Sequence, residues 1–554
     1  EEAGKFSEQE LAPTNRLGDV NGAKIVDGKV ISHESLKTAF DAYRDAGWSG
    51  LRAPADYGGQ GLPSVVSTAC EELFTSANLA FSLMPMLTMG AAEALLHHAS
   101  DEIKQAYLPN MSAGLWSGTM NLTEPQAGSD LAQVASKAVP NDDGSYAITG
   151  QKIFITWGEH ELTENIVHLV LARLPDAPAG VKGISLFVVP KFLVGADGQL
   201  GERNTLEVVS LEHKMGIHAS PTCVMQFNGA RGLLVGTAGR GLNHMFTMMN
   251  HARLGVGVEG HAVAERAYQM AVAYAKERVQ SRAVDSQSHD AVAIIQHPDV
   301  RRLLLTQKAT IEAQRALIFV GANLLDKATD HPVASEKEAA LHTLSFLIPI
   351  IKAWCTENVN VLTNQALQVF GGMGYVEETG IAQLVRDARI TAIYEGTTGI
   401  QALDLVGRKT AMDQGEAAKV FLAEGVRIAE ALAKAGEPGL AEALSHALAL
   451  AKESATYVVM AFAKGQPADA AAGSVPFLMQ MGVTLGAIEM GRAYLASVAA
   501  LNDSVGAMLP EAFYTQKKQT VNVYFDHVLV QIETYSRQLI NGSKSILNYS
   551  LDTL

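Results

Sequence analysis

Four short clusters in the sequence combine residue types that could hold a ligand or move a proton. The first, residues 123–130 (TEPQAGSD), offers hydroxyl groups, a glycine and backbone N–H groups that could bind a polar ring edge or a phosphate. The second, residues 150–157 (GQKIFITW), is typical of a strand, so Phe154 and Thr156 share one face and could support a flat heteroaromatic ring. Both patterns also occur without function, as a capped turn and as an aromatic core residue.

The other two clusters follow long helical patterns. Residues 368–375 (QVFGGMGY) place two adjacent glycines at a helix end, which allows close backbone approach to a ligand and is equally typical of an ordinary C-cap. Residues 392–398 (AIYEGTT) place Glu395 at a corner between helices, with Gly396 leaving room beside it. A carboxylate in an apolar pocket has a raised pKa and can accept a proton near neutral pH. The alternative is a glutamate favoured in a first helical turn.

The elements that must position these clusters fall into four segments. Residues 1–117 are rich in helix formers and predict a helical domain. Residues 118–235 change to short β-branched and aromatic runs between turns, which predicts an antiparallel β domain. Helical patterns return over residues 236–409 and continue, rich in alanine, over residues 410–554. The predicted fold is α+β and mainly α, with a central β domain, a helical bundle and an additional C-terminal helical domain.

One glycine pattern within the third segment imitates a nucleotide-binding motif. Gly255, Gly257 and Gly260 spell GxGxxG, but they follow a helical stretch and not the strand that a dinucleotide fingerprint requires. We therefore interpret them as small residues that let two helices pack closely. Two methionine-rich stretches, residues 84–86 and 245–249, could line a substrate pocket, although methionine more often fills a core.

Composition narrows the classes of function. The chain has 43 Lys and Arg against 58 Asp and Glu, and its net charge of −15 argues against a nucleic-acid or anionic-membrane binder. Its most apolar run, residues 344–351, is far shorter than the roughly 20 residues of a membrane span, and the N-terminus has no signal-peptide core. Three distant cysteines predict neither a disulfide framework nor a metal site, and they fit a reducing, cytoplasmic compartment.

Together and in this order, several motifs closely resemble the acyl-CoA dehydrogenase family over most of residues 30–409. They are TEPQAGSDL, GQKIFIT, HKMGIHASPTC, HARLGVG, AKERV, QVFGGMGY and YEGTTGIQ. The resemblance implies an N-terminal helical domain, a middle β domain and a four-helix bundle. It implies FAD as cofactor, bound between the β domain and the bundle and partly held by a neighbouring subunit. The implied activity is α,β-dehydrogenation of an acyl-CoA thioester.

The same resemblance assigns roles to particular residues. Glu395 matches the catalytic base, and the position just before Arg253, where some branches carry their base, is Ala252, which cannot accept a proton. FAD contacts are implied at Met120, Leu122, Thr123, Gly128, Ser129, Phe154, Thr156, Arg278, Gln368, Gly371, Gly372 and Thr397. Substrate contacts are implied at Ser129, Arg253, Tyr375, Glu395 and Gly396. The family usually has glycine where this chain has Gln126 and often asparagine where it has Trp157.

The segment from residue 410 to 554 exceeds the ordinary family length. It resembles a branch that includes 3-methylmercaptopropionyl-CoA dehydrogenases, enzymes of dimethylsulfoniopropionate catabolism, and some fatty acyl-CoA dehydrogenases. In related long enzymes the extension covers a surface otherwise used for tetramer contacts, so the resemblance implies a homodimer. It also implies an electron-transfer flavoprotein as acceptor.

Three other functions remain open at this stage. An acyl-CoA or nitroalkane oxidase could use the same fold, although the nitroalkane type has aspartate where this chain has Glu395. A flavin-bearing DNA-associated or scaffold relative is disfavoured by the net charge of −15. A short- or medium-chain saturated fatty acyl-CoA dehydrogenase is compatible with the sequence.

Overall fold

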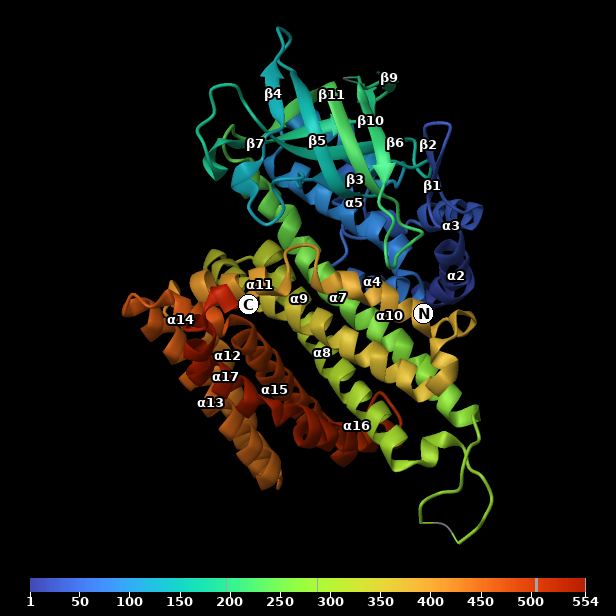
Figure 1. The fold of residues 1–554 in the computed structure, drawn as a ribbon, viewed down its shortest axis with the longest axis vertical. Helices are drawn as coiled ribbons and strands as arrows, with labels where there is room; N and C mark the ends of the chain where they lie inside the picture. The colour runs from blue at the N-terminus through green and yellow to red at the C-terminus, as the bar shows by residue number, and fades with distance from the viewer. Residues whose placement is uncertain (196, 286, 504–506, 554) are drawn as a thin grey trace. The chain divides into compact units, whose positions relative to one another are not determined.

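The chain folds into two compact units, Glu1–Gly255 and Val256–Leu554. The computed structural model describes residues 1–195, 197–285, 287–503 and 507–553 (Figure 1). Helices at both ends of the chain flank a β region in the sequence, which confirms the predicted mainly helical α+β fold. The boundaries proposed for the four segments stay predictions.

The first unit begins with helices. They are α1 (Glu2–Phe6), α2 (Ala12–Asn21), α3 (Glu34–Asp45), α4 (Ser64–Ala77), α5 (Leu79–His98) and α6 (Asp101–Ser112), with a hairpin of β1 (Lys24–Val26) and β2 (Lys29–Ile31) after α2. Side chains define where the later helices start, because a cap satisfies one of the free N–H groups of the first turn. Asn78 Oδ1 accepts a hydrogen bond from Phe81 N at 3.0 Å, and Ser100 Oγ accepts one from Ile103 N at 3.4 Å.

The β region forms a sheet that curls back on itself. Its strands are β3 (Trp116–Asn121), β4 (Lys137–Pro140), β5 (Tyr146–Thr156), β6 (Asn165–Arg173), β7 (Ile184–Pro190), β10 (Leu206–Leu211) and β11 (Thr222–Val235), and a separate pair consists of β8 (Phe192–Val194) and β9 (Leu200–Arg203). The order is β10-β11-β5-β4-β6-β3, and β7 pairs with both β11 and β6.

Most of these pairs are antiparallel, as predicted, but β3 and the end of β4 run parallel to β6. Parallel neighbours cannot be joined by a tight turn, so the chain must make a long connection from β3 to β6. Residues 122–136 lie in that connection, which is how the first sequence cluster comes to lie beside the sheet.

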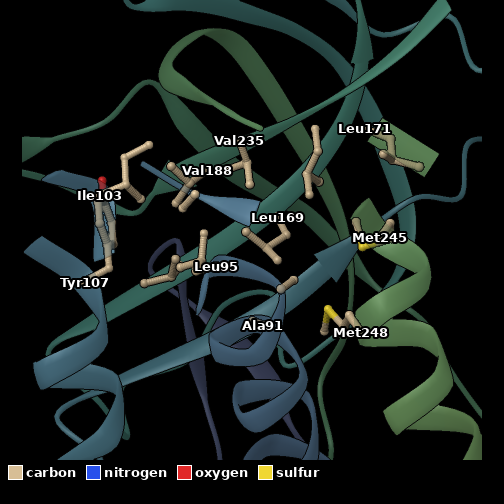
Figure 2. Close-up of a cluster of buried hydrophobic side chains, with 14 of the residues drawn as sticks. Ala91, Leu95, Ile103, Tyr107, Leu169, Leu171, Val188, Val235, Met245 and Met248 are labelled. Carbon is tan, nitrogen blue, oxygen red and sulfur yellow. The ribbon is translucent and has the colours of Figure 1, made fainter. Parts of the chain in front are cut away.

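Apolar side chains pack on both faces of this sheet. Strand β6 is buried almost along its whole length, and its residues alternate between two hydrophobic clusters. Figure 2 shows the first cluster, in which Leu169 lies among residues from α5, α6 and the start of α7. Met245 and Met248 belong to this cluster and are fully buried. These methionines therefore fill core, which is the interpretation that the sequence favoured.

The second unit is built from helices. It contains the later part of α7 (Gly241–Glu277), which starts in the first unit, followed by α8 (Pro298–Asp330), α9 (Ala334–Phe370), α10 (Ile381–Ala388), α11 (Thr398–Asp404), α12 (Glu416–Lys434), α13 (Pro438–Ala463), α14 (Pro467–Ala472), α15 (Ser474–Asn502), α16 (Glu511–Tyr524) and α17 (Gln531–Leu547). The short α14 lies between the two long helices α13 and α15. Pro467 occupies its first turn, where proline is favoured because no N–H partner is lost.

The C-terminal extension packs directly on the bundle within this unit. A Cβ on Gly482 of α15 would lie 2.4 Å from Cγ of Trp354 on α9, and one on Gly486 would lie 2.4 Å from the Tyr524 hydroxyl. Glycine at both positions therefore lets α15 approach its neighbours. Apolar residues spaced three and four apart near the C-terminus share one face: Phe525, Val528, Ile532 and Leu539 are buried and Tyr535 is half-buried.

The GxGxxG glycines lie inside α7 and not after a strand. A Cβ on Gly257 would lie 2.5 Å from Cγ2 of Ile351, and one on Gly260 would lie 3.1 Å from the backbone of Cys355. These glycines therefore allow α7 and α9 to pack closely, which confirms the interpretation as packing residues.

Two helical stretches are long and apolar enough to cross a membrane by length and composition, a result that the sequence analysis did not anticipate. They are Leu79–His98 and Ala334–Tyr375. Their most apolar windows are 56% and 72% buried inside the fold, as core helices of a folded domain also are.

Candidate active site

Glu395 lies in a short turn between the single 3₁₀ turn Arg389–Ala392 and α11. The backbone is left-handed at Glu395, with φ 54°, and at Gly396, with φ 87°. Side-chain-bearing residues rarely adopt this conformation, and such strain concentrates at functional sites. A Cβ on Gly396 would lie 2.7 Å from Nε2 of Gln401, so glycine is needed there for space as well as for its backbone angle.

Two buried side chains hold the backbone of this turn. Lys352 Nζ on α9 donates to the Gly396 carbonyl at 2.8 Å. Gln401 Nε2 on α11 donates to the Glu395 carbonyl at 3.0 Å and to the Gly396 carbonyl at 3.4 Å. Both side chains are 0% exposed, and Glu395 itself is half-buried. The backbone that carries the Glu395 side chain is therefore held in place, as the backbone of a positioned base must be.

Thr397 is the N-cap residue of the next helix, α11. Its Oγ1 accepts a hydrogen bond from Ile400 N at 3.3 Å, which caps α11. The neighbouring Thr398 donates to Glu357 Oε1 at 2.5 Å. The start of α11, directly after the turn at Glu395, is thus held by hydrogen bonds of both Thr397 and Thr398.

Replacing Gly396 by alanine should disturb this turn. A Cβ at φ 87° is strained and meets Gln401, so we expect a loss of about 1–3 kcal/mol in the free energy of unfolding and a clear fall in turnover. Urea unfolding and steady-state rates would measure both. Gly439→Ala is the control, because its Cβ would meet nothing within 4 Å. Equal behaviour of the two variants would contradict the importance of the turn.

In the first unit, a buried lysine holds the loop after β3, which contains the predicted FAD contacts Leu122 and Thr123. Lys152 Nζ on β5 donates to the Leu122 carbonyl at 3.0 Å and to Glu124 Oε1 at 2.8 Å. Ser136 donates to the same Glu124 oxygen from its N–H at 3.1 Å and from its hydroxyl at 2.6 Å. The Thr123 carbonyl accepts a hydrogen bond from Ile153 N at 2.9 Å, which ties the loop to β5 next to Phe154.

The pKa values of the ion pair formed by Lys152 and Glu124 are shifted by burial and by their mutual attraction. Burial by itself would raise the pKa of Glu124, but the charge and hydrogen bond of Lys152, with those of Ser136 and Ala135, lower it to about 2. Burial lowers the pKa of Lys152 to about 8, although Glu124 opposes this shift. The lysine is 0% and the glutamate 4% exposed. An ion pair with this many hydrogen bonds makes the loop rigid.

Gln126, which departs from the family pattern, also braces the loop. Its Nε2 donates to Glu124 Oε2 at 2.6 Å and to the Gln133 carbonyl at 3.2 Å. Trp157, the other departure, is buried and donates from Nε1 to the Ala80 carbonyl at 3.1 Å. Both residues therefore contribute contacts that a glycine or an asparagine could not make in the same way.

Phe154 lies at an irregularity in β5. The register with β11 shifts between Ile155 and Lys152, and Phe154 adopts a left-handed backbone with φ 60°. At this β-bulge Phe154 is 57% exposed, whereas Lys152 and Ile155 are buried. Thr156, two residues further along β5, is half-buried.

The remaining predicted contacts are placed as follows. In the first unit, Met120, Leu122 and Thr123 are half-buried, Gly128 and Ser129 are exposed, and Arg253 is buried on α7. In the second unit, the predicted contacts near the ends of α7 and α9 are all exposed, namely Arg278, Gln368, Gly371, Gly372 and Tyr375. Gly371 and Gly372 would each carry a Cβ into open space.

These features fit FAD. An exposed aromatic ring beside a loop with a fixed backbone can support a flat heteroaromatic system, and Phe154 with Leu122 and Thr123 provides this arrangement. The exposed Gly371 and Gly372 at the end of α9 leave space for a ligand to approach the backbone closely. Within the described residues, no group of three or more His, Cys, Asp or Glu side chains is arranged to hold a metal ion.

Comparison with protein families identifies the class. Four family models match the chain: the N-terminal, middle and C-terminal domains of acyl-CoA dehydrogenase over residues 1–115, 119–230 and 239–410, and an acetyl-CoA dehydrogenase C-terminal like domain over residues 422–550. The chain therefore belongs to the acyl-CoA dehydrogenase family, whose members are FAD-dependent oxidoreductases that act on acyl-CoA.

Individual relatives refine this result. A 3-methylmercaptopropionyl-CoA dehydrogenase of Ruegeria pomeroyi is 48% identical over 100% of this chain and 93% of its own length. A butyryl-CoA dehydrogenase of Syntrophomonas wolfei is 39% identical over 78% of this chain and 72% of its own. An acyl-CoA dehydrogenase structure from Bacillus anthracis in complex with FAD has a TM-score of 0.77 at 21% identity, covers 99% of this chain and 89% of its own, and supports the fold.

Sequence reasoning missed the buried groups that hold these segments. Lys152, Lys352 and Gln401 were not predicted to have a role. Lys352 gave a signal, since it follows the apolar run of residues 344–351 and a lysine at such a position is rarely buried without a partner. Its partner, the Gly396 carbonyl, lies 44 positions away and had no comparable signal.

Proposed function

We propose that this chain catalyses the α,β-dehydrogenation of a short acyl-CoA thioester, with Glu395 as the base that removes the α-proton. The observation that carries this proposal is the left-handed turn at Glu395 and Gly396, held by Lys352 and Gln401. Proton removal next to a carbonyl needs a carboxylate in a fixed position. FAD, when bound, supplies the acceptor for the hydride that leaves the β-carbon.

The α-proton of a thioester is only weakly acidic, and a backbone donor of this chain can compensate for that by stabilising the charge that forms when it is removed. Removing this proton moves negative charge onto the thioester oxygen, so a donor directed at that oxygen lowers the barrier. The Glu395 N–H lies on the fixed turn and is the donor that the family resemblance implies. Because Lys352 and Gln401 hold the carbonyls of the turn, this N–H needs little reorganisation as the charge develops.

We propose 3-methylmercaptopropionyl-CoA as the substrate. The support is the relative of that name from Ruegeria pomeroyi, whose 48% identity extends over the whole chain, including the C-terminal extension. Butyryl-CoA, a saturated short-chain substrate, is the second candidate, and the relative from Syntrophomonas wolfei at 39% identity supports it.

A steady-state comparison with an artificial electron acceptor would separate these candidates. Pentanoyl-CoA is the matched control, because it differs from 3-methylmercaptopropionyl-CoA only by a methylene in place of the sulfur. Because one methylene in an apolar pocket changes kcat/KM by about 10–200-fold, we expect the thioether substrate to exceed butyryl- and octanoyl-CoA by at least about tenfold. A higher kcat/KM for butyryl-CoA would assign the enzyme to saturated acyl groups instead.

Three further properties are part of the proposal. A homodimer is supported by the C-terminal extension, which packs on the bundle and resembles that of the dimeric long enzymes. An electron-transfer flavoprotein as acceptor and a cytoplasmic location are supported by the family resemblance and by the three free cysteines, respectively. Light scattering of the holoenzyme would measure the oligomeric state.

A further inference from the structure

A second buried carboxylate lies next to the catalytic turn. Glu259, on the part of α7 that belongs to the second unit, is 3% exposed. The Tyr394 hydroxyl donates a hydrogen bond to its Oε2. Its Oε1 is also buried and has no hydrogen-bond partner among the described residues. Because Tyr394 directly precedes Glu395, this bond fixes the residue at which the catalytic turn begins.

The charges around Glu259 come from three other parts of the unit. Lys352 faces it from α9, Tyr394 and Glu395 face it from the turn, and Asp387 of α10 acts on Tyr394. Lys352 is the cation in this set, and its ammonium already donates to the Gly396 carbonyl. If Glu259 is neutral, Lys352 and Glu395 balance each other. An ionised Glu259 would add a second buried negative charge, which is unfavourable without its own partner.

The pKa of Glu259 is consistent with the neutral form. Burial raises this pKa to about 8, with the charge of Glu395 adding to the effect and Tyr394 and Lys352 opposing it. Near pH 7 the carboxyl is therefore mostly protonated, and its Oε2 can still accept the hydrogen bond of Tyr394.

We propose that Glu259 is a positioning residue for the catalytic base. As a neutral acid that accepts a hydrogen bond from Tyr394, it fixes the turn that carries Glu395. Because it carries no charge, the positive charge of Lys352 compensates the Glu395 carboxylate alone. The proposal rests on the proposed function, because that function makes Glu395 the base. Ionisation of Glu259 would place a negative charge close to the one that develops on the substrate, and turnover should then fall.

Glu259→Gln tests the charge, because glutamine has the size of the neutral acid and retains an acceptor for Tyr394. We expect kcat near pH 7 to stay close to that of the wild type. The fall of the wild-type kcat above about pH 8 should disappear in this variant. Glu277→Gln, an exposed position at the end of the same helix, is the matched control and should leave the profile unchanged.

Glu259→Leu and Tyr394→Phe test the positioning. Each removes the hydrogen bond from one side, so we expect a loss of up to about 100-fold in kcat with a smaller change in KM, as for a small misplacement of a catalytic group. The double variant should lose little more than either single variant, because both remove the same bond.

Thermal unfolding gives a readout that does not depend on activity. Between the ordinary pKa of 4.5 and about 8, folded Glu259 holds a proton that the unfolded chain has released. Its contribution to stability therefore falls as the pH rises through this window and is constant above it. The Tm of Glu259→Gln relative to the wild type should consequently rise from pH 5 to pH 8.

The outcomes separate the two proposals. Superimposable pH profiles and Tm curves for the wild type and Glu259→Gln, or full activity of Glu259→Leu, would overturn the role of Glu259. A wild-type enzyme without acyl-CoA-dependent turnover, or an undiminished Glu395→Gln variant, would instead overturn the proposed function.

Discussion

Glu395→Gln should lose acyl-CoA turnover by up to about 10⁴-fold, which is the upper range for removing a general base. Glutamine has the same size and keeps the backbone N–H, but it cannot accept the α-proton. The carbonyls of the turn remain bonded to Lys352 and Gln401, so its geometry should persist. We therefore expect unchanged FAD content and unchanged affinity for a CoA ligand, measured from the flavin absorbance and its perturbation on titration.

The control for this variant is Glu378→Gln. Glu378 is an exposed glutamate in the same unit, and its substitution changes the net charge by the same amount. Its turnover should equal that of the wild type. If Glu395→Gln also retained wild-type turnover with the flavin bound, Glu395 would not be the base, and the reaction would need a proton acceptor elsewhere.

Lys152→Met should have the second largest effect, on stability and on the flavin. Methionine fills the space but leaves Glu124 without its cation in a buried site, and breaking a buried ion pair from one side costs about 3–5 kcal/mol. The Leu122 carbonyl also loses its donor, so the loop that the family resemblance places at the flavin edge should loosen. Urea unfolding and the ratio of bound FAD to protein would measure the two effects.

Two further variants make this prediction specific. Lys137→Met changes an exposed lysine one strand away and should cost little. The double variant Lys152→Met with Glu124→Gln removes the stranded charge, so it should recover part of the lost stability, as replacement of whole buried pairs often does. A cost for Lys152→Met no larger than that for Lys137→Met would show that the pair does not hold the loop.

Local patterns were sufficient to predict the fold class, whereas the residue proposed as base was predicted from the family resemblance. The composition changes from helix formers to β-branched residues near residue 118, between α6 and the strands that begin with β3. It changes back near residue 236, between β11 and α7. Two threonines follow Gly396, a residue type that favours helix N-caps, and Thr397 is the one that caps α11. Such features depend on neighbours in the chain, so the sequence contains them directly.

The geometry of β5 could not be predicted in this way. An alternating pattern places Phe154 and Thr156 on one face, but it gives no indication of the bulge or of the left-handed backbone at Phe154. The bulge arises from the pairing with β11, about 70 residues further along the chain, and pairing irregularities depend on the partner strand. The same limit applies to the parallel pairing of β3 with β6.

The sequence by itself determined the order of elements, the composition of each cluster and the glutamate at position 395. Only the tertiary structure decided which interactions hold these parts. They are the ion pair of Lys152 with Glu124, the hydrogen bond of Lys352 to the Gly396 carbonyl and the hydrogen bond of Tyr394 to Glu259. The physical reason is that a buried charged or polar group is tolerated only where folding brings it a partner. In this chain those partners lie 28, 44 and 135 positions apart, beyond the reach of any local pattern.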